Sequence, residues 1–240
     1  MKKIFILIFS ILFLTANLTL ALSEETVNDV VDRLQSRYNK TSDFSAIFTQ
    51  ETMTKSLGVP AVVNGKVYFK KPGMMRWKYT DPITHEIITD GQTLWYYFPE
   101  EKQVRIYKTA EAFENELFLG FLFGEGKLTD DFEVALGGPE LDISEDYFVL
   151  MLAPKNPDTV IERIILLVDK EEYIVNQINT YDILGNVSRI AFEEISLNTG
   201  LKNSLFHFIV PSGVETIKIE GELAGPPETD VEVEIIERDD

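Results

Sequence analysis

The side chains that most often carry out chemistry in proteins are scarce in this chain of 240 residues. It has no cysteine and only two histidines, His85 and His207. The absence of cysteine excludes a disulfide, a thiolate nucleophile and a cysteine-based metal site. The two histidines lie far apart and show no metal-ligand spacing, so we interpret each as a hydrogen-bonded strand residue. We therefore predict no metal site and no cofactor.

Catalytic motifs are also missing from the sequence. No G-x-S-x-G places a serine on a strained turn. Gly124-Glu125-Gly126 is not followed by the Gly-Lys-Ser/Thr of a phosphate-binding loop. With 40 acidic residues, chance alone produces carboxylate pairs of the kind that glycosidases use. We expect a protein that is not an enzyme, and an enzyme acting on lipids or glycans is the least favoured alternative.

Arg76 is the charged residue with the most unusual surroundings. It lies in residues 71–82, where a Pro-Gly turn leads into a short run rich in methionine and aromatic side chains. A guanidinium is costly to bury unless its donors are satisfied, so we interpret Arg76 as an anchor at the wall of an apolar space. Alternation along a strand lets only one of Arg76 and Trp77 face that space.

A surplus of apolar side chains distinguishes the sequence more than any polar group does. The chain contains 16 phenylalanines, and residues 94–98 (LWYYF) are apolar at every position. A strand with one face in water would alternate instead. Two interpretations are open: a strand packed on both faces, or a wall whose second face lines a ligand cavity.

The net charge narrows the class of partner. The formal charge is −18, which argues against nucleic-acid binding because that depends on neutralising phosphates with Lys and Arg. It also disfavours adsorption to an anionic membrane surface. We expect the acidity to keep the protein soluble and monomeric.

The first residues have the pattern of a signal peptide. Lys2 and Lys3 precede an apolar run over residues 4–14, and Thr19-Leu20-Ala21 fits a cleavage site. The apolar run is short for a membrane span, although a retained anchor is the alternative. We predict a signal peptide over residues 1–21 and an exported protein, which in a Gram-negative cell is periplasmic.

One helix and many short strands are predicted in the main domain, residues 22–220. Residues 24–40 have an apolar stripe at helical spacing, with Ser23 as the expected N-cap. The stripe consists of Val27, Val30, Val31, Leu34 and Tyr38. Alternating runs then follow at regular spacing, including strands expected at 86–89, 93–98, 103–107, 132–136, 147–152, 160–168, 173–181, 187–195, 205–210 and 214–219. This pattern favours an antiparallel barrel or strongly curved sheet.

Two segments depart from the strand pattern. Residues 110–123 (AEAFENELFLGFLF) are apolar around a whole helix, which indicates either a buried core helix or a hinged apolar cover. Residues 221–240 form an acidic C-terminal extension that contains a Gly-Pro-Pro linker signal at 225–227. We expect this extension to be solvated, with an added edge strand as the alternative.

Several short motifs together resemble the outer-membrane lipoprotein carrier family, LolA. The matching pieces are DFSAIFTQ at 43–50, GKVYFKKPG at 65–73, MRWKY at 75–79, Pro82, TDG at 89–91 and LWYY at 94–97. The resemblance extends from about Val27 to Ile219 and implies a periplasmic carrier with an unclosed antiparallel β-barrel and a helical lid over an apolar cavity. The implied partners are lipoproteins, an inner-membrane ABC transporter and an outer-membrane receptor. A carrier or sensor of another lipid or hydrophobic ligand is the alternative.

The resemblance also implies roles for particular residues. Arg76 corresponds to an arginine that latches the lid, which favours Arg76 facing the interior with Trp77 on the other face. The expected wall of the acyl-chain cavity comprises Phe48, Phe69, Trp95 and Tyr97. The expected lid residues are Phe113, Leu117, Phe118, Phe121 and Leu122.

Overall fold

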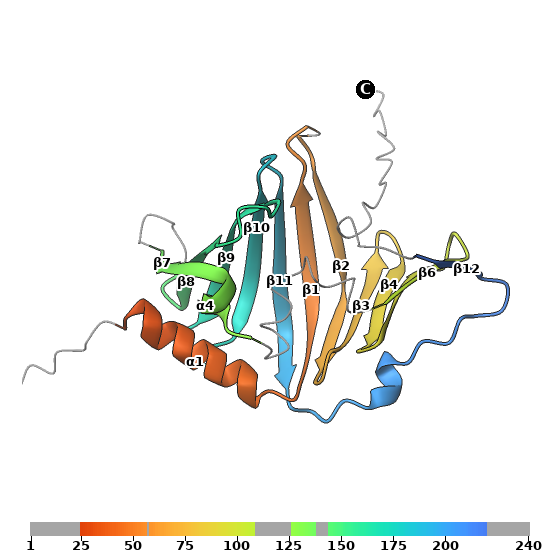
Figure 1. Cartoon of the computed structure of the whole chain (residues 1–240), viewed down its shortest axis with the longest axis horizontal. Helices are drawn as coiled ribbons and strands as arrows, with labels where there is room; N and C mark the ends of the chain where they lie inside the picture. Colours follow the sequence, from red (N-terminus) through yellow and green to blue (C-terminus); the bar gives the residue numbers. More distant parts are fainter. Residues whose placement is uncertain (1–24, 57, 109–125, 138–143, 220–240) are drawn as a thin grey trace, which may run out of the picture.

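The computed structural model describes residues 25–56, 58–108, 126–137 and 144–219, which form one large sheet with a helix lying on it (Figure 1). The helices are α1 (Val27–Lys40), the short α4 (Leu128–Asp131) and the 3-10 helix η2 (Asn203–Phe206). The strands are β1 (Asp43–Met53), β2 (Pro60–Lys70), β3 (Met74–Asp81), β4 (His85–Asp90), β5 (Thr93–Phe98), β6 (Gln103–Lys108), β7 (Phe132–Leu136), β8 (Tyr147–Pro154), β9 (Ile161–Asp169), β10 (Val175–Asp182), β11 (Val187–Leu197) and β12 (Glu215–Lys218).

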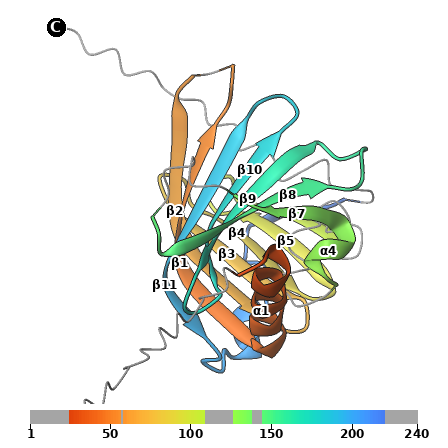
Figure 2. The same cartoon turned by 90° about the vertical axis from the view of Figure 1, so that its left-hand side faces the viewer.

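The sheet has twelve strands in the order β12-β6-β5-β4-β3-β2-β1-β11-β10-β9-β8-β7. Every neighbouring pair is antiparallel except β12 and β6, which are parallel. The two end strands, β7 and β12, do not pair with each other, and Figure 2 shows that the sheet curves strongly around α1. The predicted class, a mainly β fold with an unclosed, curved antiparallel sheet, is therefore confirmed.

Helix α1 begins three residues later than predicted, at a reciprocal cap. Thr26 is the N-cap, and its hydroxyl accepts a hydrogen bond from the Asp29 backbone N–H at 3.3 Å. The Asp29 carboxylate in turn accepts from the Thr26 backbone N–H at 3.0 Å, which satisfies two donors at the helix start. The predicted cap, Ser23, lies outside the described residues. The predicted apolar stripe is confirmed, because Val30, Leu34 and Tyr38 are buried against the sheet.

One face of the sheet packs against α1, and we call it the helix face. It is defined by Phe44, Phe48, Phe69 and Trp77, which share one buried cluster with the α1 stripe. The Phe48 and Trp77 ring centroids are 4.7 Å apart, and those of Phe44 and Phe69 are 5.7 Å apart. Gly65 is paired with Phe48, and a Cβ at that position would lie 2.7 Å from the Phe48 ring, so the ring needs a glycine beneath it.

The opposite side of the sheet, which we call the outer face, carries Arg76. Strand pairing aligns Arg76 with Ile88 and Ile88 with Trp95, whereas Trp77 aligns with Ile87 on the helix face. Directly paired residues share a face, so alternation separates Arg76 from Trp77 as predicted. The expectation that Arg76 faces the interior is wrong, because Trp77 is the residue that packs into the cluster beneath α1.

The C-terminal segment crosses the outer face instead of forming a strand at 205–210. After η2, the partly buried Phe208 and Val210 pack on a small cluster around Trp95. Their alternating pattern comes from an extended chain lying on the sheet, not from pairing within it. This crossing brings β12 to β6 with the chain running in the same direction, which explains the one parallel pair.

Several predicted segments lie outside the described residues: the signal peptide 1–21, the helix expected at 110–123 and the acidic extension 221–240. Across the part of the chain that the structure describes, no helix has the length and apolar character needed to cross a membrane.

The two histidines occupy different surroundings. His207 directly follows η2 and lies outside any strand, so its assignment to a strand is wrong. His85 begins β4 as predicted, but an aromatic stack holds it: its ring centroid is 3.9 Å from that of Tyr79 and 5.9 Å from that of Phe98. Its Nδ1 is buried and has no hydrogen-bond partner among the described residues. This burial lowers the pKa of His85 to about 4.

We predict that His85 makes the protein less stable as the pH falls from about 6.5 to about 4. In this window the unfolded chain takes up a proton that the folded chain excludes, so the free energy of unfolding falls by up to roughly 3 kcal/mol. Above pH 6.5 the contribution is constant. Urea unfolding across this range should show that the free energy of unfolding falls more steeply with falling pH in the wild type than in His85→Phe, which retains the aromatic stack. The control, His207→Gln, should follow the wild type. Parallel pH profiles for the wild type and His85→Phe would refute this assignment.

Candidate functional site

The helix face and its cover, α1, form the candidate site. Phe48 and Phe69 both lie on this face, in contact with the aromatic cluster around Trp77. The structure therefore brings together two of the four residues expected to line a cavity. Trp95 and Tyr97 lie on the outer face, where Phe208 covers them at centroid distances of 6.1 and 5.1 Å.

This separation explains why β5 is apolar at every position. Leu94 and Tyr96 are buried on the helix face with Tyr107. Trp95 and Tyr97 pack beneath the C-terminal segment on the other side. The sequence left two interpretations of this strand open, packing on both faces or a cavity wall. The structure shows the strand packed on both faces.

Arg76 is held by polar contacts on the outer face. Its Nε donates to Glu86 Oε2 at 2.8 Å, and its Nη1 donates to the carbonyl oxygen of Leu205 at 2.8 Å. Glu86 also pairs with Lys78, at 3.4 Å. These described contacts join β3, β4 and η2. The expected lid residues Phe113, Leu117, Phe118, Phe121 and Leu122 lie outside the described residues, so the lid-latch role of Arg76 stays a prediction.

Helix α1 is attached to the sheet by polar contacts around its apolar stripe. Arg37 forms an ion pair with Glu172 in the β9–β10 turn. Arg33 donates to the Tyr173 hydroxyl at 2.9 Å. The Tyr38 hydroxyl accepts from the Val175 backbone N–H at 3.2 Å, and burial raises the pKa of Tyr38. The cover is thus apolar where it meets the sheet and polar where it meets water.

Lys71 holds the C-terminal end of α1, and sequence reasoning missed this role. Its Nζ donates to the carbonyl oxygens of Tyr38 at 2.6 Å and Asn39 at 3.2 Å. Carbonyl groups at a helix C-terminus carry partial negative charge, so an ammonium group is stabilising there. The sequence gives little sign of this contact, because the β1–β2 hairpin separates Lys71 from α1 along the chain.

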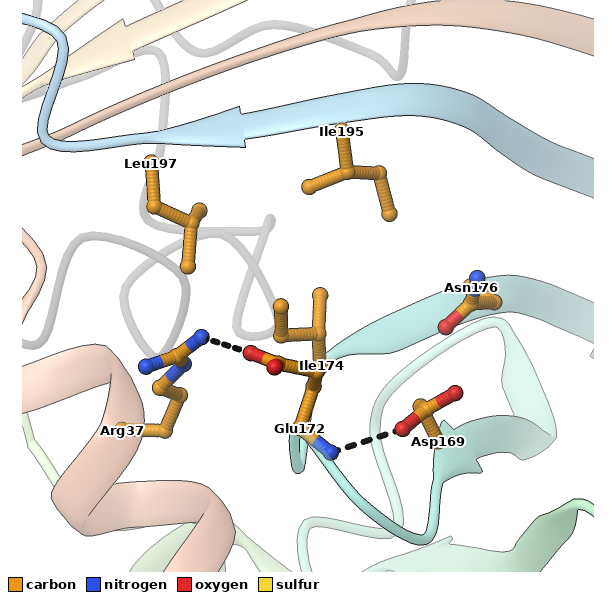
Figure 3. Close-up of a pocket in the computed structure, with 7 residues that line it drawn as sticks. All are labelled: Arg37, Asp169, Glu172, Ile174, Asn176, Ile195 and Leu197. Atoms are coloured by element: carbon orange, nitrogen blue, oxygen red, sulfur yellow. Dashed lines mark hydrogen bonds and ion pairs between the residues drawn. The ribbon is translucent and has the colours of Figure 1, made fainter.

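A pocket opens where the C-terminal part of α1 meets β10 and β11 (Figure 3). Its volume is ≈ 420 Å³. The described residues that line it are Arg37, Asp169, Glu172, Ile174, Asn176, Ile195 and Leu197. The ion pair between Arg37 and Glu172 lies across the pocket, as Figure 3 shows. Apolar side chains face this pair, Ile174 from the residue before β10 and Ile195 and Leu197 from β11, so the pocket marks a polar edge of the apolar cluster.

The chemistry available at this site is apolar binding. Among the described residues no group of three or more His, Asp or Glu side chains could hold a metal ion. The helix face instead offers packed aromatic and aliphatic side chains beneath a cover that is attached by individual polar contacts. Such a surface suits a ligand made of hydrocarbon, which needs no specific hydrogen bonds.

Comparison with known proteins gives consistent matches. The family described as "Outer membrane lipoprotein carrier protein LolA" matches residues 39–209. An outer-membrane lipoprotein carrier protein of Hahella chejuensis is 31% identical, with 78% of this chain and 88% of that protein covered. The carrier of Actinobacillus succinogenes is 30% identical, with 84% and 92% covered.

Among solved structures, a LolA superfamily protein from Nitrosomonas europaea is 14% identical with a TM-score of 0.42, covering 77% of this chain and 99% of that one. The assignment rests on the sequence matches, which include most of the described domain and which name carriers, not enzymes. The chain therefore belongs to the outer membrane lipoprotein carrier protein LolA family.

Proposed function

We propose that this protein is a periplasmic carrier that binds the acyl chains of lipoproteins against the helix face, beneath α1. It accepts them from an inner-membrane ABC transporter and delivers them to an outer-membrane receptor. The observation that carries this proposal is the continuous apolar cluster on the helix face, closed by a helix with reversible polar attachments, in a member of the LolA family.

Binding of acyl chains requires α1 to move. The pocket of ≈ 420 Å³ lies near the lower end of the range for small-molecule sites, about 300–1,000 Å³. Packed interiors have few voids larger than a water molecule, so several acyl chains do not fit without displacing side chains. The α1 stripe occupies the apolar surface that the acyl chains need. When α1 is displaced, the acyl chains replace its apolar stripe as the partner of the helix face.

The energetics set the direction of transfer. Each buried methylene contributes ~0.8 kcal/mol, so three acyl chains together gain on the order of 30 kcal/mol in a bilayer. Non-covalent affinity in proteins saturates near roughly 20 kcal/mol. Loading must therefore draw on an energy source outside this chain, such as the transporter, whereas unloading into a membrane runs downhill.

The polar attachments of α1 suit a cover that opens. Ion pairs at the surface contribute about 0–1 kcal/mol each, because water competes for both partners. The Arg37–Glu172 ion pair is of this kind, and Lys71 adds hydrogen bonds to the carbonyl oxygens of Tyr38 and Asn39. They hold α1 in register without adding a large barrier to its release.

We predict that Lys71→Met loosens α1 selectively. Loss of the ammonium at the helix C-terminus should cost about 1 kcal/mol, which corresponds to a roughly fivefold increase in amide hydrogen exchange within α1. Hydrogen-exchange mass spectrometry of the α1 peptide measures this change.

Lys70→Met is the matched control, because the Lys70 ammonium contacts the Leu201 carbonyl oxygen in the C-terminal segment. This variant should leave α1 exchange unchanged. An equal increase in both variants would show that Lys71 has no specific hold on α1.

The proposed function is tested by release of cargo. Inner-membrane vesicles that contain the transporter and a lipoprotein are mixed with the purified protein and ATP. We expect the lipoprotein to appear in the soluble fraction as a one-to-one complex, with its acyl chains detected by mass spectrometry. If the lipoprotein stays in the membrane while another lipid co-purifies, the protein carries a different ligand.

A further inference from the structure

Among the described residues, exposed large apolar side chains gather at one end of the sheet. Six of them lie in or beside the β1–β2, β8–β9 and β10–β11 turns: Met53, Val59, Val62, Val160, Ile183 and Leu184. We call these six residues the apolar rim. In Figure 1 the β1–β2 and β10–β11 turns rise at the end of the sheet away from α1. Exposed apolar groups that cluster in this way indicate a binding surface.

Hydrogen bonds join the three turns into one surface. The Lys55 backbone N–H donates to Asn186 Oδ1 at 3.0 Å, which links the β1–β2 and β10–β11 turns. The Ile183 backbone N–H donates to the Val160 carbonyl oxygen at 3.0 Å, which links the β10–β11 and β8–β9 turns. The apolar rim is therefore held in place by the fold and is preorganised for contact.

Ile183 and Leu184 are held outward by the turn itself. The Asp182 carboxylate accepts from the backbone N–H groups of Leu184 at 2.9 Å and Asn186 at 2.8 Å. Gly185 follows with a φ of +87°, a conformation that favours glycine. The result is a tight turn whose two apolar side chains are 65% and 70% exposed.

The charge at this end differs from that of the whole chain. In residues 53–60, 155–160 and 182–187, two lysines balance two aspartates, whereas the chain carries −18. The Lys55 side chain lies over Gly185, with its Nζ 3.3 Å from the place of an added Cβ. Lys55 forms no ion pair with any described residue. A cation thus lies beside the two exposed apolar side chains, and the Asp182 carboxylate of the same turn accepts backbone N–H groups.

We propose that the apolar rim docks on the surface of a phospholipid bilayer. Ile183 and Leu184 enter the boundary between headgroups and acyl chains, and the Lys55 ammonium approaches the headgroup phosphates. Apolar tips with an adjacent cation suit this boundary, because it offers hydrocarbon and phosphate within a few ångströms. The apolar rim is made of turns that project from the end of the sheet, a shape that suits contact with a flat surface.

This docking goes beyond the carrier function, because it requires no cargo and no transporter. Two apolar side chains and one cation give weak, reversible attachment, as a protein that moves between membranes needs. The acidic remainder of the chain opposes close approach to strongly anionic surfaces. The apolar rim therefore favours contact with zwitterionic lipid.

The proposal is tested by flotation with phosphatidylcholine vesicles. The protein is used without the predicted signal peptide, residues 1–21, and is purified without cargo. We expect the wild type to float and the Ile183→Ser, Leu184→Ser double variant to partition about tenfold more weakly, because two inserted side chains are lost. Ile209→Ser is the matched control: Ile209 is 76% exposed but lies in the C-terminal segment, away from the apolar rim. Its partition should equal that of the wild type.

A second measurement reports insertion directly. Leu184→Trp should be quenched by brominated phosphatidylcholine, whereas the native Trp77 and Trp95 are buried and should not respond. The proposal is overturned if the wild type fails to float, if the double variant floats as well as the wild type, or if Ile209→Ser loses as much as the double variant. The proposal is also overturned if brominated lipid does not quench the tryptophan of Leu184→Trp. The same holds if this tryptophan becomes buried only when a protein partner is added.

Discussion

The structure depends on one contact, the packing of the α1 apolar stripe against the aromatic helix face. Leu34 and Tyr38 on α1 share a buried cluster with Phe48 and Trp77 on the sheet. Without α1 a curved sheet would expose this cluster to water, and exposed apolar patches of that kind lead to association. In the proposed function the same cluster binds acyl chains. This proposal requires the contact to be stable enough to fold and weak enough to be exchanged for lipid.

The surroundings of α1 fit this requirement. Its polar attachments lie at the water-facing edge, where Arg37 meets Glu172 and where Lys71 meets the last turn of the helix. The outer face is built differently: the C-terminal segment covers it, and Arg76 joins Glu86 to the Leu205 carbonyl oxygen. One face of the sheet is thus closed by a cover with few polar attachments, and the other is closed by the chain that continues into β12.

Much of this fold could be predicted from local patterns, because strand alternation and the helical stripe depend only on neighbouring residues. The same alternation separates Arg76 from Trp77 but does not say which of them faces the helix. That choice depends on where α1 packs, which is a long-range contact. For the same reason Trp95 and Tyr97 were expected in the cavity wall although Phe208 covers them. The contact of Lys71 with α1 joins distant segments and leaves almost no signal in the sequence.

The central claim is that α1 must leave the helix face before lipid can bind. Because the chain has no cysteine, Arg37→Cys with Glu172→Cys allows a short bismaleimide to link α1 to the β9–β10 turn without side reactions. Uptake of a lipoprotein from transporter-containing vesicles is then measured with and without the cross-link. The account predicts normal uptake by the unlinked double variant and loss of uptake after cross-linking. Equal uptake by both forms would contradict it.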